Sequence, residues 1–252
     1  MTGAMRLFIA THAPSPLPEI SQDFSVIGLG GFRPETALPV VTDDTGDSIS
    51  AKNRHYSELT GHYWLWKNLA GPAIVGVCQY RRYFLFNPHS PRPKVRVVMT
   101  APNLARLTGP QCRDFVQSAL EVADVIVPRS QELGEPLSSQ YVSCHRKEDW
   151  NLFLQAIGET CQDFRTHISW FDRTTSAHLY NMMIAPKPFF DAYMTRLFAV
   201  TDWMERQGLF PVEPYQCRVP AFIAERFFSF YLHVTQARCF EVPVAVLDPK
   251  AF

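Results

Sequence analysis

The chain has 252 residues, of which 46% are hydrophobic and 19% are charged, and its formal net charge at pH 7 is zero. This composition is typical of a folded globular protein with one sizeable domain, and it excludes a disordered chain. A neutral chain also has no overall field to attract nucleic acid, so any anion binding must come from a local cluster of basic residues.

The first half of the sequence alternates short apolar runs with a helical pattern. Residues 6–11 (RLFIAT) predict a buried strand, and residues 53–67 predict a helix with apolar positions three to four apart. A second buried strand, 74–78, runs directly into the letters QYRRY. The proline-rich residues 86–103 predict an excursion or lid with one short strand.

The second half continues the alternation. Helices are predicted at 111–123, from about Arg146, from Pro188 and from Pro220, strands at 124–128, 179–185 and 237–248, and a polar loop at 129–143. The pattern predicts one α/β domain, 1–252, with a mostly parallel central sheet and helices on both faces. Ligands of such sheets bind at the carboxyl ends of the strands, where His12 and Tyr80 are expected.

Cysteines and hydropathy suggest the compartment. The six cysteines form no C-x-x-C pair, which argues against a zinc site. A reduced set of thiols fits best, although three long-range disulfides stay open. The first residues, MTGAMRLFIATHAP, do not have the pattern of a secretory signal, and no apolar run reaches the roughly 18 residues of a membrane span. We therefore expect a cytoplasmic protein, with peripheral contact at the inner face of the membrane left open.

The adjacent residues Arg81 and Arg82 are the first candidate site. Two guanidinium groups can neutralise a diphosphate through charge-assisted, bidentate hydrogen bonds. The same charges can stabilise a diphosphate as it leaves. The alternative is a solvated strand end, with surface salt bridges and with Tyr80 and Tyr83 used for packing.

Acidic residues supply further candidates, each with a structural alternative. Asp43, Asp44 and Asp47 are close enough in sequence to hold Mg²⁺ or to accept hydrogen bonds from a ribose, yet Asp-Gly turns are also common solvent loops. Asp149 lies in the first turn of a predicted helix, where it also suits the helix dipole. Glu225 precedes an arginine and could simply pair with it.

Several familiar motifs are missing. The sequence has no G-x-G-x-x-G, P-loop, G-x-S-x-G or H-E-x-x-H, and no D-x-D follows an apolar strand. A D-x-D motif would hold a divalent cation against a diphosphate. Its absence favours arginine charge in that place, with no required metal, while Mg²⁺ or Mn²⁺ at the aspartates stays open.

Longer segments, taken together, resemble a known family. DDTGDSISAKNRHYSELTGHYWLWKN followed by VGVCQYRRYF, and later YNMMIAPKPFFDAY and VPAFIAERFFSFYL, are similar to a family of bacterial proteins encoded in capsular and exopolysaccharide loci. That family has been described only as a domain of unknown function and is regarded as glycosyltransferase-like, with a GT-A-like fold. The pattern has a histidine where this chain has Gln79, so a base or metal ligand is not expected there, whereas hydrogen bonding is.

The resemblance implies a glycosyltransferase that moves a sugar from a nucleoside diphosphate donor to an oligosaccharide or lipid-linked glycan acceptor. An acceptor hydroxyl is deprotonated by a carboxylate in an inverting transferase. The expected roles are donor binding for His12, Asp47, Asn53 and Glu58, hydrogen bonding or stacking near the diphosphate for Gln79 and Tyr80, charge neutralisation for Arg81 and Arg82, acceptor binding for Asn181, and general base for Glu225 or else Asp149.

Two other classes of function stay open from the sequence. One is a non-catalytic module that binds a nucleotide sugar or a glycan. The other is a nucleotide-sugar hydrolase or phosphoryl transferase, in which water or phosphate replaces the glycan acceptor. Release of free nucleoside diphosphate, with and without acceptor, separates these classes.

Overall fold

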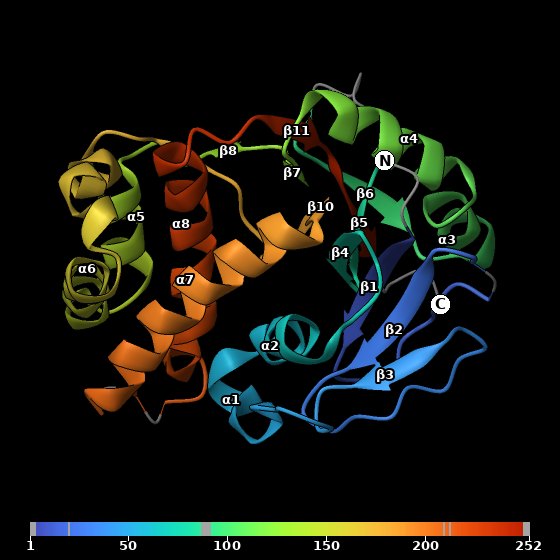
Figure 1. Ribbon diagram of the computed structural model, residues 1–252, viewed down its shortest axis with the longest axis horizontal. Helices are drawn as coiled ribbons and strands as arrows, with labels where there is room; N and C mark the ends of the chain where they lie inside the picture. Colours follow the sequence, from blue (N-terminus) through green and yellow to red (C-terminus); the bar gives the residue numbers. More distant parts are fainter. Residues whose placement is uncertain (1–3, 20, 87–91, 209, 212, 249–252) are drawn as a thin grey trace.

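The computed structural model describes residues 4–19, 21–86, 92–208, 210–211 and 213–248. A central sheet has the strand order β11-β7-β10-β4-β1-β2-β3, and it continues from β4 through β5 and β12 to β6 (Figure 1). The strands are β1 (Met5–Thr11), β2 (Phe24–Gly28), β3 (Val40–Thr42), β4 (Ile74–Gln79), β5 (Arg82–Phe84), β6 (Lys94–Val98), β7 (Val125–Pro128), β10 (Met183–Pro186), β11 (Cys239–Val242) and β12 (Val244–Asp248). A small separate sheet pairs β8 (Gln131–Glu132) with β9 (Ser176–Ala177).

The core of the sheet is parallel. Strands β3, β2, β1 and β4 lie side by side in parallel, and β11 is parallel to β7. Strand β10 is inserted antiparallel between β4 and β7. Strand β1 is buried at every position except Arg6, which is typical of a strand covered on both faces. The predicted mixed α/β fold with a mostly parallel sheet is confirmed.

Helices cover both faces of this sheet, as Figure 1 shows. One face packs against α2, α6, α7 and α8 in the larger apolar core, and the other packs against α3 and α4 in the smaller one. The helices are α1 (Asn53–Tyr56), α2 (Leu59–Asn68), α3 (Ala101–Leu107), α4 (Gln111–Val122), α5 (Leu137–Cys144), α6 (Lys147–Thr160), α7 (Lys187–Arg206) and α8 (Val219–Val234), with 3₁₀ helices η1 (Ser50–Lys52), η2 (Gln162–Asp172) and η3 (Gln216–Arg218).

The helices and cysteines bear on two expectations from the sequence, the lack of a membrane span and the state of the thiols. Among the described helices, none is long and apolar enough to cross a bilayer. All six cysteines lie in the described part of the chain and all are free.

Two predicted elements are interrupted where the chain approaches the ends of β1 and β4. The expected helix 53–67 is broken at Ser57, whose φ of 49° and ψ of −127° separate α1 from α2. The expected strand 179–185 begins only at Met183, because Tyr180 and Asn181 have φ values of 84° and 49°. Left-handed backbone at residues other than glycine is strained and is found most often at functional sites.

Two segments without a clear apolar period contain regular structure. Within 86–103, the one predicted short strand is present as β6, which pairs with β12 in the central sheet, and α3 starts at Ala101. A lid role for this segment stays a prediction. Residues 87–91 lie outside the described part. The predicted polar loop 129–143 contains β8 and most of α5, because Leu137 and Tyr141 are buried on one helix face.

The aspartate-rich turn has a structural core at Asp43, which is completely buried. Its carboxylate accepts hydrogen bonds from the N–H groups of Gly30 and Gly31, at 2.9 and 3.2 Å, and from the hydroxyls of Ser50 and Thr60, at 2.6 and 2.5 Å. Gly30 and Gly31 have φ values of 61° and 77°, and glycine adopts these angles without strain. Asp43 therefore ties the turn after β2 to η1 and α2.

Replacing Asp43 with alanine is expected to destabilise the fold by about 3 kcal/mol or more, because it leaves buried donors without a partner. Its neighbour Asp44 is the matched control, since Asp44 pairs at 2.7 Å with an Arg33 side chain that is 59% exposed. Asp44→Ala should cost less than about 1 kcal/mol. Urea unfolding of both variants measures the difference, and equal losses would contradict this role for Asp43.

Candidate functional site

A cleft of about 370 Å³ opens at the carboxyl ends of β1 and β4. This is the edge where open α/β sheets bind ligands. The residues that line the cleft come from the ends of three strands and from the helical segments opposite: Ala10, His12, Leu29, Asn53, Arg54, Ser57, Glu58, Gln79, Tyr80, Arg81, Arg82 and Arg218.

A hairpin presents the arginine pair to the cleft. Strand β4 does not run out into a loop but turns back as β5, with Gln79 paired to Arg82 and with Tyr80 and Arg81 in the turn. Gln79 donates to the carbonyl of Tyr180 at 2.7 Å and accepts from Arg82. Gln79 therefore holds one of the two guanidinium groups in place.

Aromatic rings also position these charges. The guanidinium carbon of Arg82 lies 4.9 Å from the centre of the Tyr180 ring, and that of Arg81 lies 4.9 Å from the Tyr80 ring. His12 contacts Tyr80 edge to face at 5.5 Å. Guanidinium groups that stack on rings keep their N–H edges available for an anion.

The opposite wall adds two arginines that sequence reasoning missed, Arg54 from α1 and Arg218 from η3. Among the described residues, no carboxylate lies within 4.0 Å of the nitrogens of Arg81, Arg82 or Arg218. Glu58 is the one carboxylate among the described residues that line the cleft. The cleft is therefore locally cationic in a chain whose net charge is zero.

Glu58 is held from behind by Asn181. The Asn181 amide nitrogen donates to Glu58 Oε1 at 2.7 Å and to the carbonyl of Ala221 at 3.1 Å. The Asn181 backbone carbonyl is 3.0 Å from Nε2 of the buried His62. Asn181 is 6% exposed, and its Oδ1 atom has no hydrogen-bond partner among the described residues. Asn181 therefore acts on the cleft through Glu58, whose carboxylate it holds.

Glu225 lies behind the cleft and not in its lining. One carboxylate oxygen accepts from the Tyr180 N–H at 2.9 Å, and the other pairs with Arg226 at 2.9 Å. Burial raises the pKa of Glu225, the nearby Arg226 opposes this, and Glu58 adds to it. Both oxygens of Glu225 are thus occupied within the protein.

Asp47 and Asp149, two other candidates from the sequence, are not brought to the cleft. Asp47 accepts from the hydroxyl of Tyr63 at 3.0 Å, and its N–H donates to the side chain of Asn68 at 2.9 Å, so it fastens the turn to α2. Asp149 is buried in the first turn of α6, with Oδ2 4.0 Å from Arg146. Nothing in the described residues places either carboxylate against the arginine pair.

Asp149 should make stability depend on pH. Burial raises its pKa to about 6, while an unfolded aspartate has a pKa near 3.8. Between these values the folded protein keeps the proton that the unfolded chain loses, so stability falls as pH rises through this window. From pH 4 to pH 7, the wild type should lose about 2 to 3 kcal/mol relative to Asp149→Asn. Denaturation of both proteins at the two pH values tests this, and parallel pH profiles would refute it.

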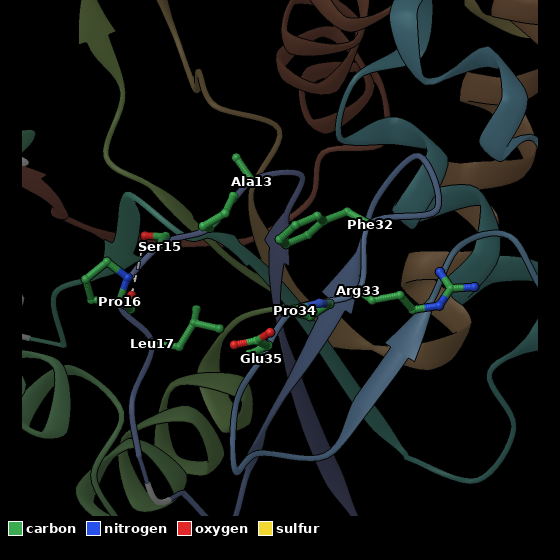
Figure 2. A pocket seen from close by; sticks show the side chains of 9 residues that line it. Ala13, Ser15, Pro16, Leu17, Phe32, Arg33, Pro34 and Glu35 are labelled. Atoms are coloured by element: carbon green, nitrogen blue, oxygen red, sulfur yellow. Dashed lines mark hydrogen bonds between the residues drawn. The ribbon is translucent and has the colours of Figure 1, made fainter.

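A second pocket, of about 550 Å³, is lined in part by Ala13, the residue that directly follows His12 of the cleft. It lies between residues 13–17, after β1, and residues 32–35, after β2. Figure 2 shows the ring of Phe32 pointing toward the segment of Ala13 and Ser15, while Arg33 points away. The pocket thus offers an aromatic face, the carboxylate of Glu35 and apolar walls.

The side chains that could bind a metal ion are the acidic, histidine and cysteine residues. Within the described ranges, no three His, Cys, Asp or Glu side chains are grouped so that they could hold a metal ion. The aspartates of the turn are engaged separately, Asp43 with four donors, Asp44 with Arg33 and Asp47 with Tyr63. Each of these aspartates therefore has partners within the protein, and a cation at the turn stays a prediction from the sequence.

Comparisons with known proteins place this geometry in context. A family described as a domain of unknown function (DUF4422) matches residues 6–236. The fold is similar to that of WbbM, a bifunctional glycosyltransferase in its apo structure, with a TM-score of 0.85 over 97% of this chain and 23% sequence identity. The chain spans 45% of the length of that protein. A search of curated proteins gives no match.

Proposed function

We propose that this chain, which belongs to the DUF4422 family, is a glycosyltransferase that moves a sugar from a nucleoside diphosphate donor to a glycan. The observation that carries the proposal is the cleft at the carboxyl ends of β1 and β4, where Arg81, Arg82 and Arg218 line the same cavity as Glu58, the one carboxylate among its described lining residues. Several positive charges and one carboxylate suit a diphosphate leaving group and a base.

The pocket beside Phe32 and the cleft suit the two parts of a nucleotide sugar. The pocket beside Phe32 takes the base, which is flat and polar at its edge, and Glu35 is available to its N–H groups. The diphosphate lies against the β4–β5 turn, where Arg81 and Arg82 neutralise it. The donor sugar then lies toward Glu58 and Asn181.

The chemistry follows from these placements. The acceptor oxygen forms a bond to the anomeric carbon of the donor sugar, while the bond from that carbon to the diphosphate oxygen breaks. Glu58 takes the proton of the acceptor hydroxyl, and Asn181 keeps one carboxylate oxygen fixed so that the other faces the cleft. The arginines stabilise the charge that grows on the departing diphosphate. Glu58 replaces Glu225 and Asp149 as the proposed base, because Glu58 alone of the three lines the cleft.

The acceptor and the setting are proposed from the sequence resemblance and from the fold shared with a bifunctional glycosyltransferase. We propose that the acceptor belongs to a bacterial surface polysaccharide. We also propose that the transfer takes place on the cytoplasmic side of the membrane, where nucleotide sugars are available.

The test is release of nucleoside diphosphate by the wild-type protein from UDP-, GDP- and dTDP-hexoses, with and without an oligosaccharide acceptor. Acceptor-dependent release supports the proposal. Equal release without acceptor indicates a hydrolase, and binding without release indicates a binding module. Because arginines are proposed to neutralise the diphosphate, EDTA should leave the rate within about twofold, and full loss with recovery on adding Mg²⁺ or Mn²⁺ would contradict that part.

A further inference from the structure

An exposed aromatic residue stands at the edge of the cleft. Tyr215 is 51% exposed, and the other large hydrophobic side chains that are exposed among the described residues are valines. The guanidinium carbon of Arg218, which lines the cleft, lies 4.7 Å from the centre of the Tyr215 ring. The Tyr215 ring therefore lies beside Arg218, a residue of the cleft wall.

Tyr215 belongs to a cluster, here called the aromatic platform, that consists of Tyr215, Phe222 and His145. The rings of His145 and Phe222 are stacked with centres 4.1 Å apart, and the rings of Tyr215 and Phe222 are 5.2 Å apart. Arg218 also lies over Phe222, at 5.2 Å. Three elements, α5, η3 and α8, meet at this surface.

Polar side chains hold the platform in place. The carboxylate of Glu213 accepts from the N–H groups of Tyr215 and Gln216, at 3.2 and 2.6 Å. Gln216 bonds in turn to His145 Nδ1 at 3.1 Å and to the carbonyl of Cys144 at 3.2 Å. The segment is thus fixed so that a large ring remains in water, which makes Tyr215 a candidate contact for a ligand.

The chemistry of the platform fits a sugar ring. A pyranose has a face of C–H bonds that packs on a flat aromatic ring, and hydroxyls at its edge that accept from a guanidinium group. Tyr215 supplies the ring and Arg218 the donors. The pocket beside Phe32 lies on the loops after β1 and β2, whereas the platform meets the cleft at Arg218. The platform therefore lies on different elements from the proposed site of the base.

We infer that the aromatic platform is the acceptor subsite and binds a pyranose ring of the glycan that receives the sugar. This inference rests on the glycosyltransferase function proposed above. It assigns the donor to the β1, β2 and β4 side of the cleft and the acceptor to the η3 and α8 side.

The experiment measures binding of methyl α- and β-hexopyranosides by saturation-transfer NMR in the presence of UDP, GDP or dTDP. The variants are Tyr215→Ala and Tyr215→Trp, and calorimetry measures the affinity of the same nucleotides for each protein. We expect Tyr215→Ala to weaken glycoside binding by roughly 2- to 12-fold, the factor for one aromatic contact. Tyr215→Trp should preserve glycoside binding, and nucleotide affinity should not change in either variant.

Three results would overturn the inference. The first is that the wild-type protein binds none of the glycosides, and the second is that Tyr215→Ala binds them as tightly as the wild type. The third is that Tyr215→Ala binds the nucleotide more weakly, which would assign the platform to the donor. Failure of the proposed function is distinguishable from these. In that case the wild type binds no nucleotide and transfers no sugar, while Tyr215→Ala still loses glycoside binding.

Discussion

Replacing Arg82 or Arg81 with alanine is expected to lower kcat by about 100- to 1,000-fold, the loss typical when one preorganised charge-stabilising group is removed. Both guanidinium groups line the cleft at the β4–β5 turn, and no carboxylate in the described part of the chain pairs with either. Their positive charge is therefore available to a diphosphate, and its loss should raise the barrier for departure of that group.

Measuring the free energy of unfolding of each variant distinguishes a loss of function from misfolding. Arg81 is exposed in a turn, so Arg81→Ala should change the free energy of unfolding by less than about 0.5 kcal/mol. Arg165 in η2 is also exposed and does not line the cleft, so Arg165→Ala is the matched control for lost charge. Lysine at Arg81 or Arg82 should restore only part of the rate, because lysine lacks the planar fork. Full activity in both alanine variants would remove the arginine pair from the mechanism.

Glu58→Gln should reduce kcat by about 100- to 10,000-fold, the range of general base catalysis. Glutamine keeps an oxygen for the amide of Asn181, at the position where Glu58 Oε1 now accepts at 2.7 Å, but it cannot take a proton. Affinity for the nucleoside diphosphate should stay within about threefold or improve slightly, since a negative charge near the phosphates is removed.

The matched control is Glu225→Gln, which changes the carboxylate behind the cleft that pairs with Arg226. If Glu58 is the base, the loss of kcat should be much larger in Glu58→Gln than in Glu225→Gln, with calorimetry showing nucleotide binding in both. The reverse order of effects would return the role of base to Glu225. Similar rates in the wild type and Glu58→Gln would show that no proton passes to Glu58.

Local sequence patterns were enough to predict the sheet and part of the site. Continuous apolar runs marked β1 and β4, and a polar residue at the end of each run, His12 and Gln79, placed the cleft at the carboxyl ends of these strands. The helix patterns also predicted α4, α6, α7 and α8 closely. These elements could be predicted because their buried residues follow the spacing of the helix or strand that they form.

The remaining features depend on contacts between distant segments. The left-handed Asn181 has no signal in apolar spacing, since its side chain bonds to the distant Glu58 and Ala221. The break at Ser57 has none either, because its carbonyl accepts from the polar side chains of Asn53 and Thr60. Arg218 reaches the cleft only because α8 packs beside α1. Asp47 lies in a turn whose composition is typical of a ligand-binding loop. Its partners are Tyr63 and Asn68 on α2, which the sequence could not reveal.

A crystal structure with a nucleoside diphosphate bound tests the central claim most directly. The account predicts that the diphosphate oxygens lie within about 3 Å of the guanidinium nitrogens of Arg81 or Arg82, at the turn between β4 and β5. A diphosphate held elsewhere, out of reach of both side chains, would contradict it.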